Sequence, residues 1–277
     1  MALFVHNLTN VDVSIWDPNH GLTGMSWQID VHLEGKLGDD GMLLDFGAVK
    51  PWIKAVLDSG PDHTLLIPTQ APNTRISSCQ EGLCFHAETP YPAEIKGPEE
   101  AFTLIPATHI DAAVFAAYGS RLLSQAYPDN VDHVGIKVHQ EAIDEAAYGY
   151  SHGLKRHSGN CQRIAHGHRS HLAVYQQGQR QPTLEAHWAE WLNHRYLVEE
   201  ADITHQSANT LTCRYTALQG NFELTLPMNR CAVLGSPTTV ENIARWLASQ
   251  IARYTGQKTE VVAYEGINKG ATADAAP

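Results

Sequence analysis

Polar and hydrophobic residues alternate without interruption from residue 28 to residue 34. The hydrophobic members are Ile29, Val31 and Leu33, and the polar members are Gln28, Asp30, His32 and Glu34. A period of two residues is typical of an antiparallel strand with one buried face. We therefore predict a strand from Gly24 to Gly35. The Gly- and Asp-rich segment Leu37–Gly41 then favours a turn.

Helical spacing appears twice. Between Asp45 and Asp58, one helix face would carry Phe46, Val49, Ile53, Val56 and Leu57. The second helix is predicted to run to Tyr254, with Thr239 as a suitable N-cap. Its buried stripe would comprise Ile243, Trp246, Leu247, Gln250 and Ile251. We expect both stripes to pack into the core.

The order of motifs is repeated along the chain. Asp62-His63 is followed by a strand-like stretch to Phe85, a helix opening at residues 107–113, and a β-rich run before Glu141. Asn193-His194 is followed by a strand-like stretch to Leu226, a helix opening at residues 238–244, and a β-rich run before Glu265. This order indicates a tandem duplication. We assign residues 1–145 to a first copy and residues 146–277 to a second, each expected to read strand, strand, helix, helix, strand, strand.

Net charge, apolar runs and cysteine count argue against several classes of protein. The 277 residues carry a formal net charge of -11, which disfavours binding to nucleic acid or to a membrane surface. No apolar run has the length of a membrane span, and the N-terminus lacks a secretory pattern, so we expect a cytoplasmic protein. The five cysteines are scattered and odd in number, which argues against a disulfide scaffold.

Histidines in the second copy carry the strongest chemical signal. His166 and His168 flank Gly167, and residues two apart on a strand point to the same face. His152, on a neighbouring strand, would complete a three-histidine site. Three imidazoles leave one position of a zinc ion open, which is the pattern of a catalytic site. His157 and His171 are rival ligands, and imidazole also suits iron or nickel.

These residues resemble the 6-pyruvoyl/6-carboxy-tetrahydropterin synthase family. The string Cys161…His166-Gly167-His168 is similar to that family's cysteine and His-Gly-His signature, and Asp62-His63 with Leu65 is similar to its Leu-Asp-His motif. Further similarity lies at Val31–Gly35, at Gly41–Phe46 with Lys50, and at Pro237–Asn242. Glu265 and Glu141 lie where the family's pterin-anchoring glutamate falls.

The resemblance implies an α+β tunnelling fold (T-fold). Each repeat would be a four-stranded antiparallel sheet with helices on one face, and several copies would assemble into a barrel, which predicts a homo-oligomer. The zinc ligands are absent from the first copy, where Leu22-Thr23-Gly24 is the predicted counterpart of His-Gly-His. The second copy in turn has Asn193 in place of Asp62. A composite site is therefore implied, formed either within one chain or between chains.

The implied reaction is a zinc-dependent (Zn2+) lyase reaction on 7,8-dihydroneopterin triphosphate. Its most favoured product is 6-carboxy-5,6,7,8-tetrahydropterin, in the queuosine (7-deazaguanine) pathway. Cys161 as a thiolate would be the general base, Asp62 would orient His63 as the second acid–base group, and Glu265 or Glu141 would bind the pterin. The alternatives are 6-pyruvoyl-type or other pterin side-chain chemistry, and an inactive pterin- or metal-binding scaffold.

Some segments depart from the family pattern or carry weaker signals. Four residues separate Cys161 from His166 where the family has three, so either a β-bulge absorbs the extra residue or the thiol has moved. Cys79, Cys84 and His86 do not have the spacing of a common zinc site. We expect a solvated loop at Thr89–Glu100 and disorder from Lys269 to Pro277.

Overall fold

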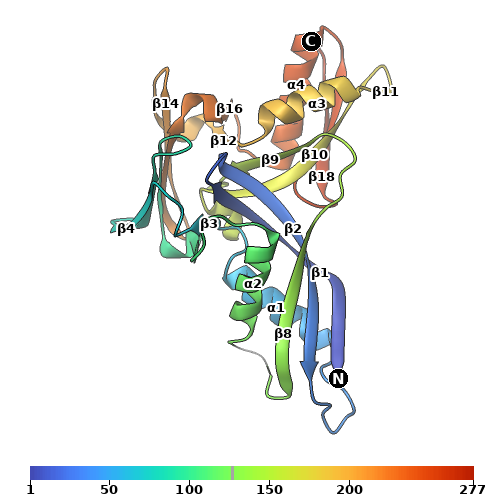
Figure 1. Cartoon of the computed structure of the whole chain (residues 1–277). Helices are drawn as coiled ribbons and strands as arrows, with labels where there is room; N and C mark the ends of the chain where they lie inside the picture. Colours follow the sequence, from blue (N-terminus) through green and yellow to red (C-terminus); the bar gives the residue numbers. More distant parts are fainter. Residues whose placement is uncertain (126–127) are drawn as a thin grey trace.

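The computed structural model describes residues 1–125 and 128–277. The helices of this part are α1 (Phe46–Ser59), α2 (Ala112–Leu123), α3 (Pro182–Leu192) and α4 (Val240–Thr255). Three sheets accompany them, and Figure 1 shows the two termini at opposite ends of the molecule. The predicted α+β class and tandem repeat are confirmed. The predicted order of elements within each copy was wrong, because strands separate the two helices of each copy.

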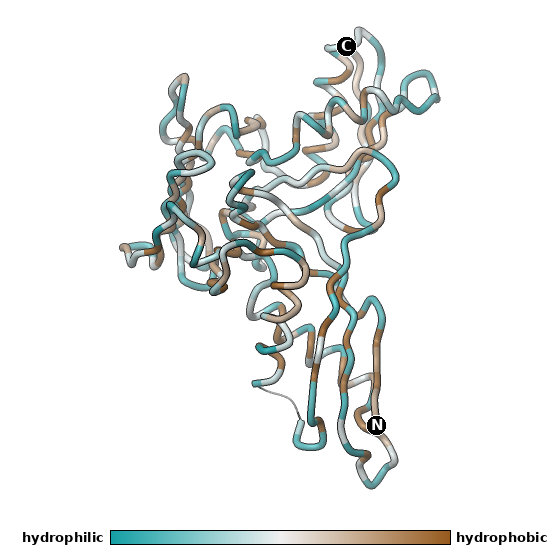
Figure 2. The backbone as a smooth tube through the Cα atoms, viewed as in Figure 1, coloured by the Kyte–Doolittle hydropathy of each residue, from teal (hydrophilic) through white to brown (hydrophobic). Residues whose placement is uncertain are grey.

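The first copy is built on a sheet with the strand order β7-β3-β1-β2-β8. Its strands are β1 (Ala2–Asp17), β2 (Gly21–Gly35), β3 (Leu65–Pro68), β7 (Phe102–Ile105) and β8 (Val131–Gln140). Strands β1, β2 and β8 pair antiparallel, whereas β3 and β7 add parallel strands at one edge. Helices α1 and α2 cover one face (Figure 1), where Val49, Ile53 and Phe115 are fully buried. Hydrophobic stretches recur along these strands (Figure 2).

The second copy repeats this plan with the order β16-β12-β9-β10-β17-β18. Its strands are β9 (Ala147–His152), β10 (His166–Gln176), β12 (Arg195–Glu199), β16 (Cys231–Leu234), β17 (Thr259–Tyr264) and β18 (Gly270–Ala275), with the short β11 (Gln179–Arg180) beside β10. Helices α3 and α4 cover this sheet. Thr239 does occupy the N-cap of α4, although its side chain makes no capping hydrogen bond.

The two copies cross where the β1–β2 hairpin meets the β9–β10 hairpin. Gly24 and Gly167 lie at this crossing, and the hydroxyl groups of Ser14 and Ser151 are 2.6 Å apart. A methyl group at Gly24 would lie 1.9 Å from the Tyr150 carbonyl oxygen, so no side chain fits there. Glycine therefore allows the two backbones to touch, and this contact brings the first copy against the histidines of the second.

A third sheet joins the copies, and the sequence did not predict it. Its order is β13-β14-β15-β6-β5-β4, formed by β4 (Thr74–Cys79), β5 (Gly82–Ala87), β6 (Ala93–Gly97), β13 (Ile203–Gln206), β14 (Thr210–Ala217) and β15 (Gly220–Pro227). The junction pairs Leu224 with Ile95, and the Lys96 ammonium lies 2.8 Å from the Glu223 carboxylate. The expected loop at Thr89–Glu100 was wrong, because β6 lies inside this sheet.

Two further expectations need correction. The tail from Lys269 is ordered as β18, which pairs with β17 from Thr259 to Tyr264. The helix opening expected from Ala107 begins later: Asp111 caps α2 by accepting a hydrogen bond of 2.8 Å from the Val114 amide. Among the described residues, no helix has both the length and the apolar character needed to cross a membrane.

Candidate metal and acid–base site

Strands β9 and β10 bring three histidines together. His152 pairs with His166 across the two strands, and His168 lies two residues further on the same face. All three side chains are almost completely buried. Their ligand atoms lie within 4.8 Å of one another, and this is the one such group found in residues 1–125 and 128–277. The rivals His157 and His171 are not part of it.

Burial keeps two of these imidazoles neutral. Desolvation, followed by the charges of neighbouring histidines, holds the pKa of both His152 and His166 well below the usual value. A metal ligand must be an unprotonated imidazole, so both rings are ready to bind at neutral pH.

Hydrogen bonds to Nδ1 leave Nε2 free in two of the three rings. The Nδ1 of His152 lies 2.9 Å from the Thr238 carbonyl oxygen, and the Nδ1 of His166 lies 3.0 Å from the Arg163 carbonyl oxygen. The Nε2 atoms of all three histidines are buried and have no hydrogen-bond partner. Buried polar atoms are rarely left without a partner. The three unpartnered Nε2 atoms therefore fit a metal ion, which His152, His166 and His168 could hold.

The predicted acid–base pair, Asp62 and His63, lies in the first copy of the same chain. Asp62 and His63 lie in the turn between α1 and β3, and Asp62 Oδ2 is 2.7 Å from His63 Nδ1. The His63 ring centroid is 5.4 Å from that of His166 and 6.3 Å from that of His168. The two half-sites that the sequence left unplaced thus meet within one chain.

The pKa of His63 is raised by its partners. Burial acts to lower it, but hydrogen bonds and charges from Asp62 and Cys161 prevail and raise the pKa of His63 to about 10. The imidazole of His63 is therefore cationic at neutral pH, between the side chains of Asp62 and Cys161.

Cys161 is carried by a 3-10 turn between β9 and β10. This turn, Asn160–Gln162, precedes the start of β10 at His166, so the residues between Cys161 and His166 lie outside the strand and the β-bulge, one of the two alternatives, is not formed. The Leu154 amide donates to the Cys161 carbonyl oxygen at 2.8 Å, which closes the loop. Cys161 is partly exposed, and its side chain lies close enough to His63 to raise the pKa of that imidazole.

The two glutamates differ in their surroundings. Glu265 follows β17, and its charge adds to burial in raising the pKa of Tyr150, whose ring contacts both His152 and His168. Glu141 instead lies near Arg169, which donates to its carbonyl oxygen. Strand register places Gln140 opposite Trp27. Gln140 is thus the counterpart of Glu265, and Glu141 lies one position further along the chain.

The first copy contains a degenerate version of the site. Ser14 pairs with Gly24 as Ser151 pairs with Gly167, so Ile15, Thr23 and Met25 stand where the three histidines stand. The counterpart of His-Gly-His is therefore Thr23-Gly24-Met25, one residue later than predicted. His194 fills this place: its Nδ1 is 2.9 Å from the Thr23 hydroxyl, and its ring stacks on His20 at 4.6 Å.

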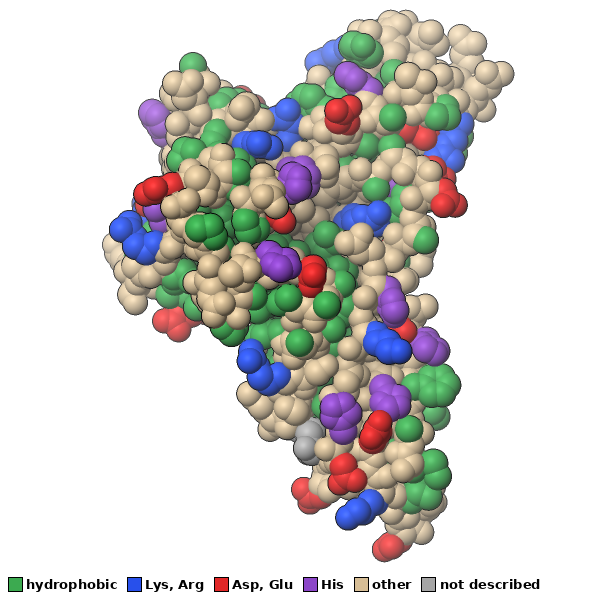
Figure 3. Space-filling model, viewed as in Figure 1, with side chains coloured by type: hydrophobic (Ala, Val, Ile, Leu, Met, Phe, Trp, Pro, Cys, Tyr) green, Lys and Arg blue, Asp and Glu red, His purple; other side chains and the backbone are tan. Residues whose placement is uncertain are grey.

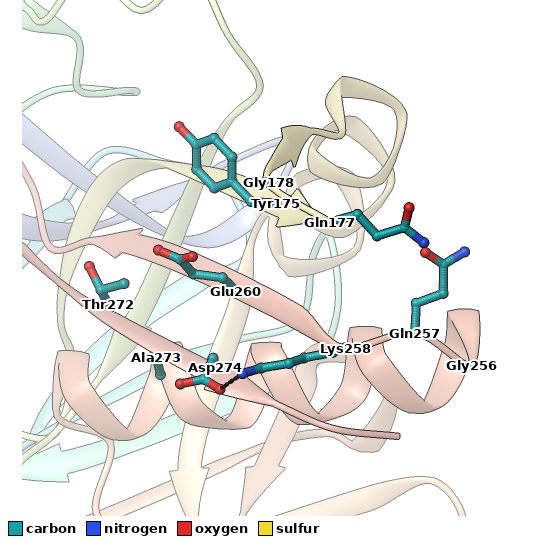
Figure 4. Close-up of a pocket in the computed structure, with 10 residues that line it drawn as sticks. All are labelled: Tyr175, Gln177, Gly178, Gly256, Gln257, Lys258, Glu260, Thr272, Ala273 and Asp274. Atoms are coloured by element: carbon teal, nitrogen blue, oxygen red, sulfur yellow. Dashed lines mark ion pairs between the residues drawn. The ribbon is translucent and has the colours of Figure 1, made fainter.

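Other surface features do not coincide with the histidine site. A hollow of about 840 Å³ at the far end of β10, β17 and β18 contains none of the predicted site residues, and its charged pair Lys258–Asp274 spans 3.0 Å (Figure 4). Histidines also gather on the exposed end of β1, β2 and β8 (Figure 3), where His6 and His139 both contact Asp30. Neither feature forms a further metal-ligand group among the described residues.

Sequence reasoning missed several residues that support the site. Arg163 donates to the Asp62 carbonyl oxygen at 3.2 Å, and its own carbonyl oxygen faces His166. Thr238 lies in the predicted helix-opening motif, but its contact with His152 had no sequence signal. Asp12 and Lys269 stand alone in the sequence and become neighbours only in the fold.

Comparison with known proteins agrees with this architecture. A sequence model of the 6-pyruvoyl tetrahydropterin synthase family matches residues 5–139 and again residues 141–276. Among solved structures, the 6-pyruvoyl tetrahydropterin synthase of Plasmodium vivax is similar, with 18% identity over 52% of this chain and 93% of that chain and a TM-score of 0.42. The Plasmodium falciparum protein has 17% identity over 50% of this chain and 90% of that chain and a TM-score of 0.40. No curated protein sequence matches. Since the family model matches nearly the whole chain in two consecutive copies, the chain belongs to the 6-pyruvoyl tetrahydropterin synthase family.

Proposed function

We propose that the chain is a zinc-dependent lyase that converts 7,8-dihydroneopterin triphosphate into a 6-substituted tetrahydropterin. The observation that carries the proposal is the set of three buried, unpartnered Nε2 atoms beside the His63–Asp62 pair. We assign 6-carboxy-5,6,7,8-tetrahydropterin as the product and the queuosine pathway as the context. This finer assignment rests on resemblance to the family alone.

A zinc ion held by His152, His166 and His168 would polarise an oxygen of the substrate side chain and so acidify the neighbouring C–H bonds. Cys161, as a thiolate, removes a proton from the side-chain carbon next to that oxygen. The His63 imidazolium stabilises the thiolate and returns a proton to the substrate at the next step. Asp62 accepts the Nδ1–H of His63, which keeps Nε2 directed at the reacting atoms.

Substrate placement is assigned to Glu265. A carboxylate can accept two parallel N–H bonds, which suits the amino and ring N–H groups of a pterin. Glu265 is preferred over Glu141 because its charge acts on Tyr150, whose ring contacts His152 and His168. Release of triphosphate would follow loss of the proton. For the 6-carboxy product, water would supply the second carboxylate oxygen, the two outer side-chain carbons would leave as an aldehyde, and the two-electron oxidation of the side chain would reduce the pterin ring.

We also propose that several chains assemble. Strands β8 and β18 are the outer strands of their sheets, and a family barrel would pair them with neighbouring chains. Light scattering on the purified protein measures this directly, and a monomer would contradict it.

The test combines metal analysis with turnover. We expect about one zinc per chain, and release of triphosphate from 7,8-dihydroneopterin triphosphate with a tetrahydropterin product identified by mass. Cys161→Ala should retain the metal and lose turnover, whereas His166→Ala should lose both. Cys84→Ala, a substitution outside the site, serves as the matched control. A wild-type protein that binds no zinc when zinc is supplied would overturn the proposal.

Product analysis separates the remaining alternatives. If the product is the 6-pyruvoyl compound, the chain is still a lyase of this class, but the proposed 6-carboxy product is wrong. A zinc-loaded protein that binds the substrate without releasing triphosphate would instead indicate a scaffold.

A further inference from the structure

Asp12 is a buried carboxylate from the first copy that lies against the metal site of the second. Its side chain is 6% exposed, and its Oδ1 lies 3.3 Å from the Nδ1 of His168. Its Oδ2 lies 3.1 Å from the Lys269 ammonium, and the Ser26 hydroxyl donates to Oδ1. Gly266 packs so closely that a methyl group there would lie 2.7 Å from Oδ1. Three separate segments thus hold this carboxylate in place: β2 with Ser26, β10 with His168, and the loop from Gly266 to Lys269.

The three candidate ligands differ in what faces their second nitrogen. Backbone carbonyl oxygens face the Nδ1 atoms of His152 and His166. The Nδ1 of His168 faces Asp12 and has no aligned hydrogen-bond partner. In metal sites, a ligating histidine almost always donates its other N–H to a carboxylate, a carbonyl group or water, which fixes the tautomer and the ring orientation.

The duplicated chain contains an internal comparison for Asp12. Strand register makes Gly149 the counterpart of Asp12, because Ser14 corresponds to Ser151. The backbone amides of both positions donate to equivalent side-chain oxygens. The Asp12 amide donates to Asp62 Oδ1 at 2.9 Å, and the Gly149 amide donates to Asn193 Oδ1 at 2.8 Å.

The neighbouring histidines complete this correspondence, since the His63 amide donates to the Asp12 carbonyl oxygen and the His194 amide donates to that of Gly149. The fold therefore does not require a side chain at this position. The carboxylate is present only where histidine ligands stand opposite. Lys269 pairs with Oδ2 and so offsets the cost of burying the carboxylate, while Oδ1 faces His168.

We infer that Asp12 is a positioning residue for the metal ligand His168. Its carboxylate accepts the Nδ1–H of His168 and directs Nε2 toward the metal, while Lys269 balances its charge. The first copy thus contributes to the metal centre as well as to the acid–base pair. This inference rests on the proposed metal site.

Metal affinity tests the role without reliance on turnover. Metal-free wild type, Asp12→Ala and Asp202→Ala are titrated with Zn2+ in competition with a chromophoric chelator. Asp202 is the matched control, because it is also buried beside a lysine, Lys155, but does not contact the histidine cluster. We expect Asp12→Ala to weaken zinc binding about 10- to 100-fold, the usual effect of losing such a support. Asp202→Ala should bind as wild type does.

Each result has a distinct meaning. Equal zinc affinity in wild type and Asp12→Ala would overturn the inference and leave the proposed function intact. No zinc binding by the wild type would overturn both.

If Asp12→Ala does not fold, the zinc-loaded wild type still decides the question by NMR. A slowly exchanging, downfield Nδ1–H on His168 supports the inference. A His168 ring bound to zinc through Nδ1, or one without a protected Nδ1–H, contradicts it.

Discussion

Replacing Asp62 with asparagine isolates the charge of the Asp62–His63 pair. Asp62 Oδ1 accepts the Asp12 amide at 2.9 Å, and Oδ2 accepts His63 Nδ1 at 2.7 Å. Asn193 makes the equivalent backbone contact in the second copy, so asparagine suits the fold at this position. The substitution therefore keeps the backbone contact and removes the charged acceptor.

The size of the effect follows from the hydrogen bond that is lost. A hydrogen bond to a charged group contributes about 1.5–3 kcal/mol to stability. At about 1.36 kcal/mol for each pKa unit, this corresponds to a fall of about 1–2 units in the pKa of His63. Turnover should fall by about 100-fold or more, since proton transfer by a positioned group contributes at least that factor.

The sign of the pH dependence is fixed by the raised pKa. The pKa of His63 rises from 6.5 in the unfolded chain to about 10 in the fold. The stabilisation is therefore complete below pH 6.5 and is lost as the pH rises through about 10. The difference in unfolding free energy between wild type and Asp62→Asn should be largest near pH 6.5 and should disappear as the pH approaches about 10.

The assay is urea unfolding of the metal-free proteins across this pH range, with NMR titration of His63. His63→Gln supplies the control: in that background, Asp62→Asn should produce no pH-dependent difference. A stability difference that stays constant between pH 6.5 and about 10 would refute the account of the pair.

Three further predictions concern the fold and its response to acid. Gly24→Ala should destabilise the protein by about 3 kcal/mol through overpacking at the hairpin crossing, whereas Gly135→Ala, which meets only one side-chain atom at 3.5 Å, should be tolerated; urea unfolding compares them. The metal-free protein should lose stability as the pH falls below 6.5, because the unfolded chain protonates His152 and His166 while the fold keeps both neutral. His166→Gln should reduce the slope of unfolding free energy against pH, and an unchanged slope would contradict this prediction. Lys96→Met, at a partly exposed ion pair, should cost about 1 kcal/mol or less in the same measurement; a much larger loss would mean that this pair holds the copies together.

The tandem repeat and the histidine cluster could both be predicted from local sequence patterns. The two-residue period placed His166 and His168 on one face, and the residues of both predicted half-sites are adjacent or nearly adjacent in the sequence. Their meeting within one chain was not predictable, because it depends on two hairpins crossing at Gly24 and Gly167. That contact leaves no periodic signal in either strand.

The features that the sequence did not predict also depend on contacts between segments that are far apart in the chain. Asp12 is separated from His168 by 156 residues, counted from their positions, and no motif links them. The third sheet depends on β6 pairing with β15 across the copies, and an isolated short strand carries no signal for its partner. The tail was expected to be disordered from its small and polar residues, but pairing with β17 orders it.

The central claim is that one chain forms one complete site from both copies. Mixing two inactive variants tests it most directly: His63→Ala keeps the metal ligands, and His166→Ala keeps the acid–base pair. The two proteins are co-expressed and co-purified with different tags, and triphosphate release is compared with that of wild type. The account predicts that the mixed assembly stays inactive, because neither chain has a complete site. Recovery of turnover in the mixture would show that the half-sites meet between chains, and would contradict the claim.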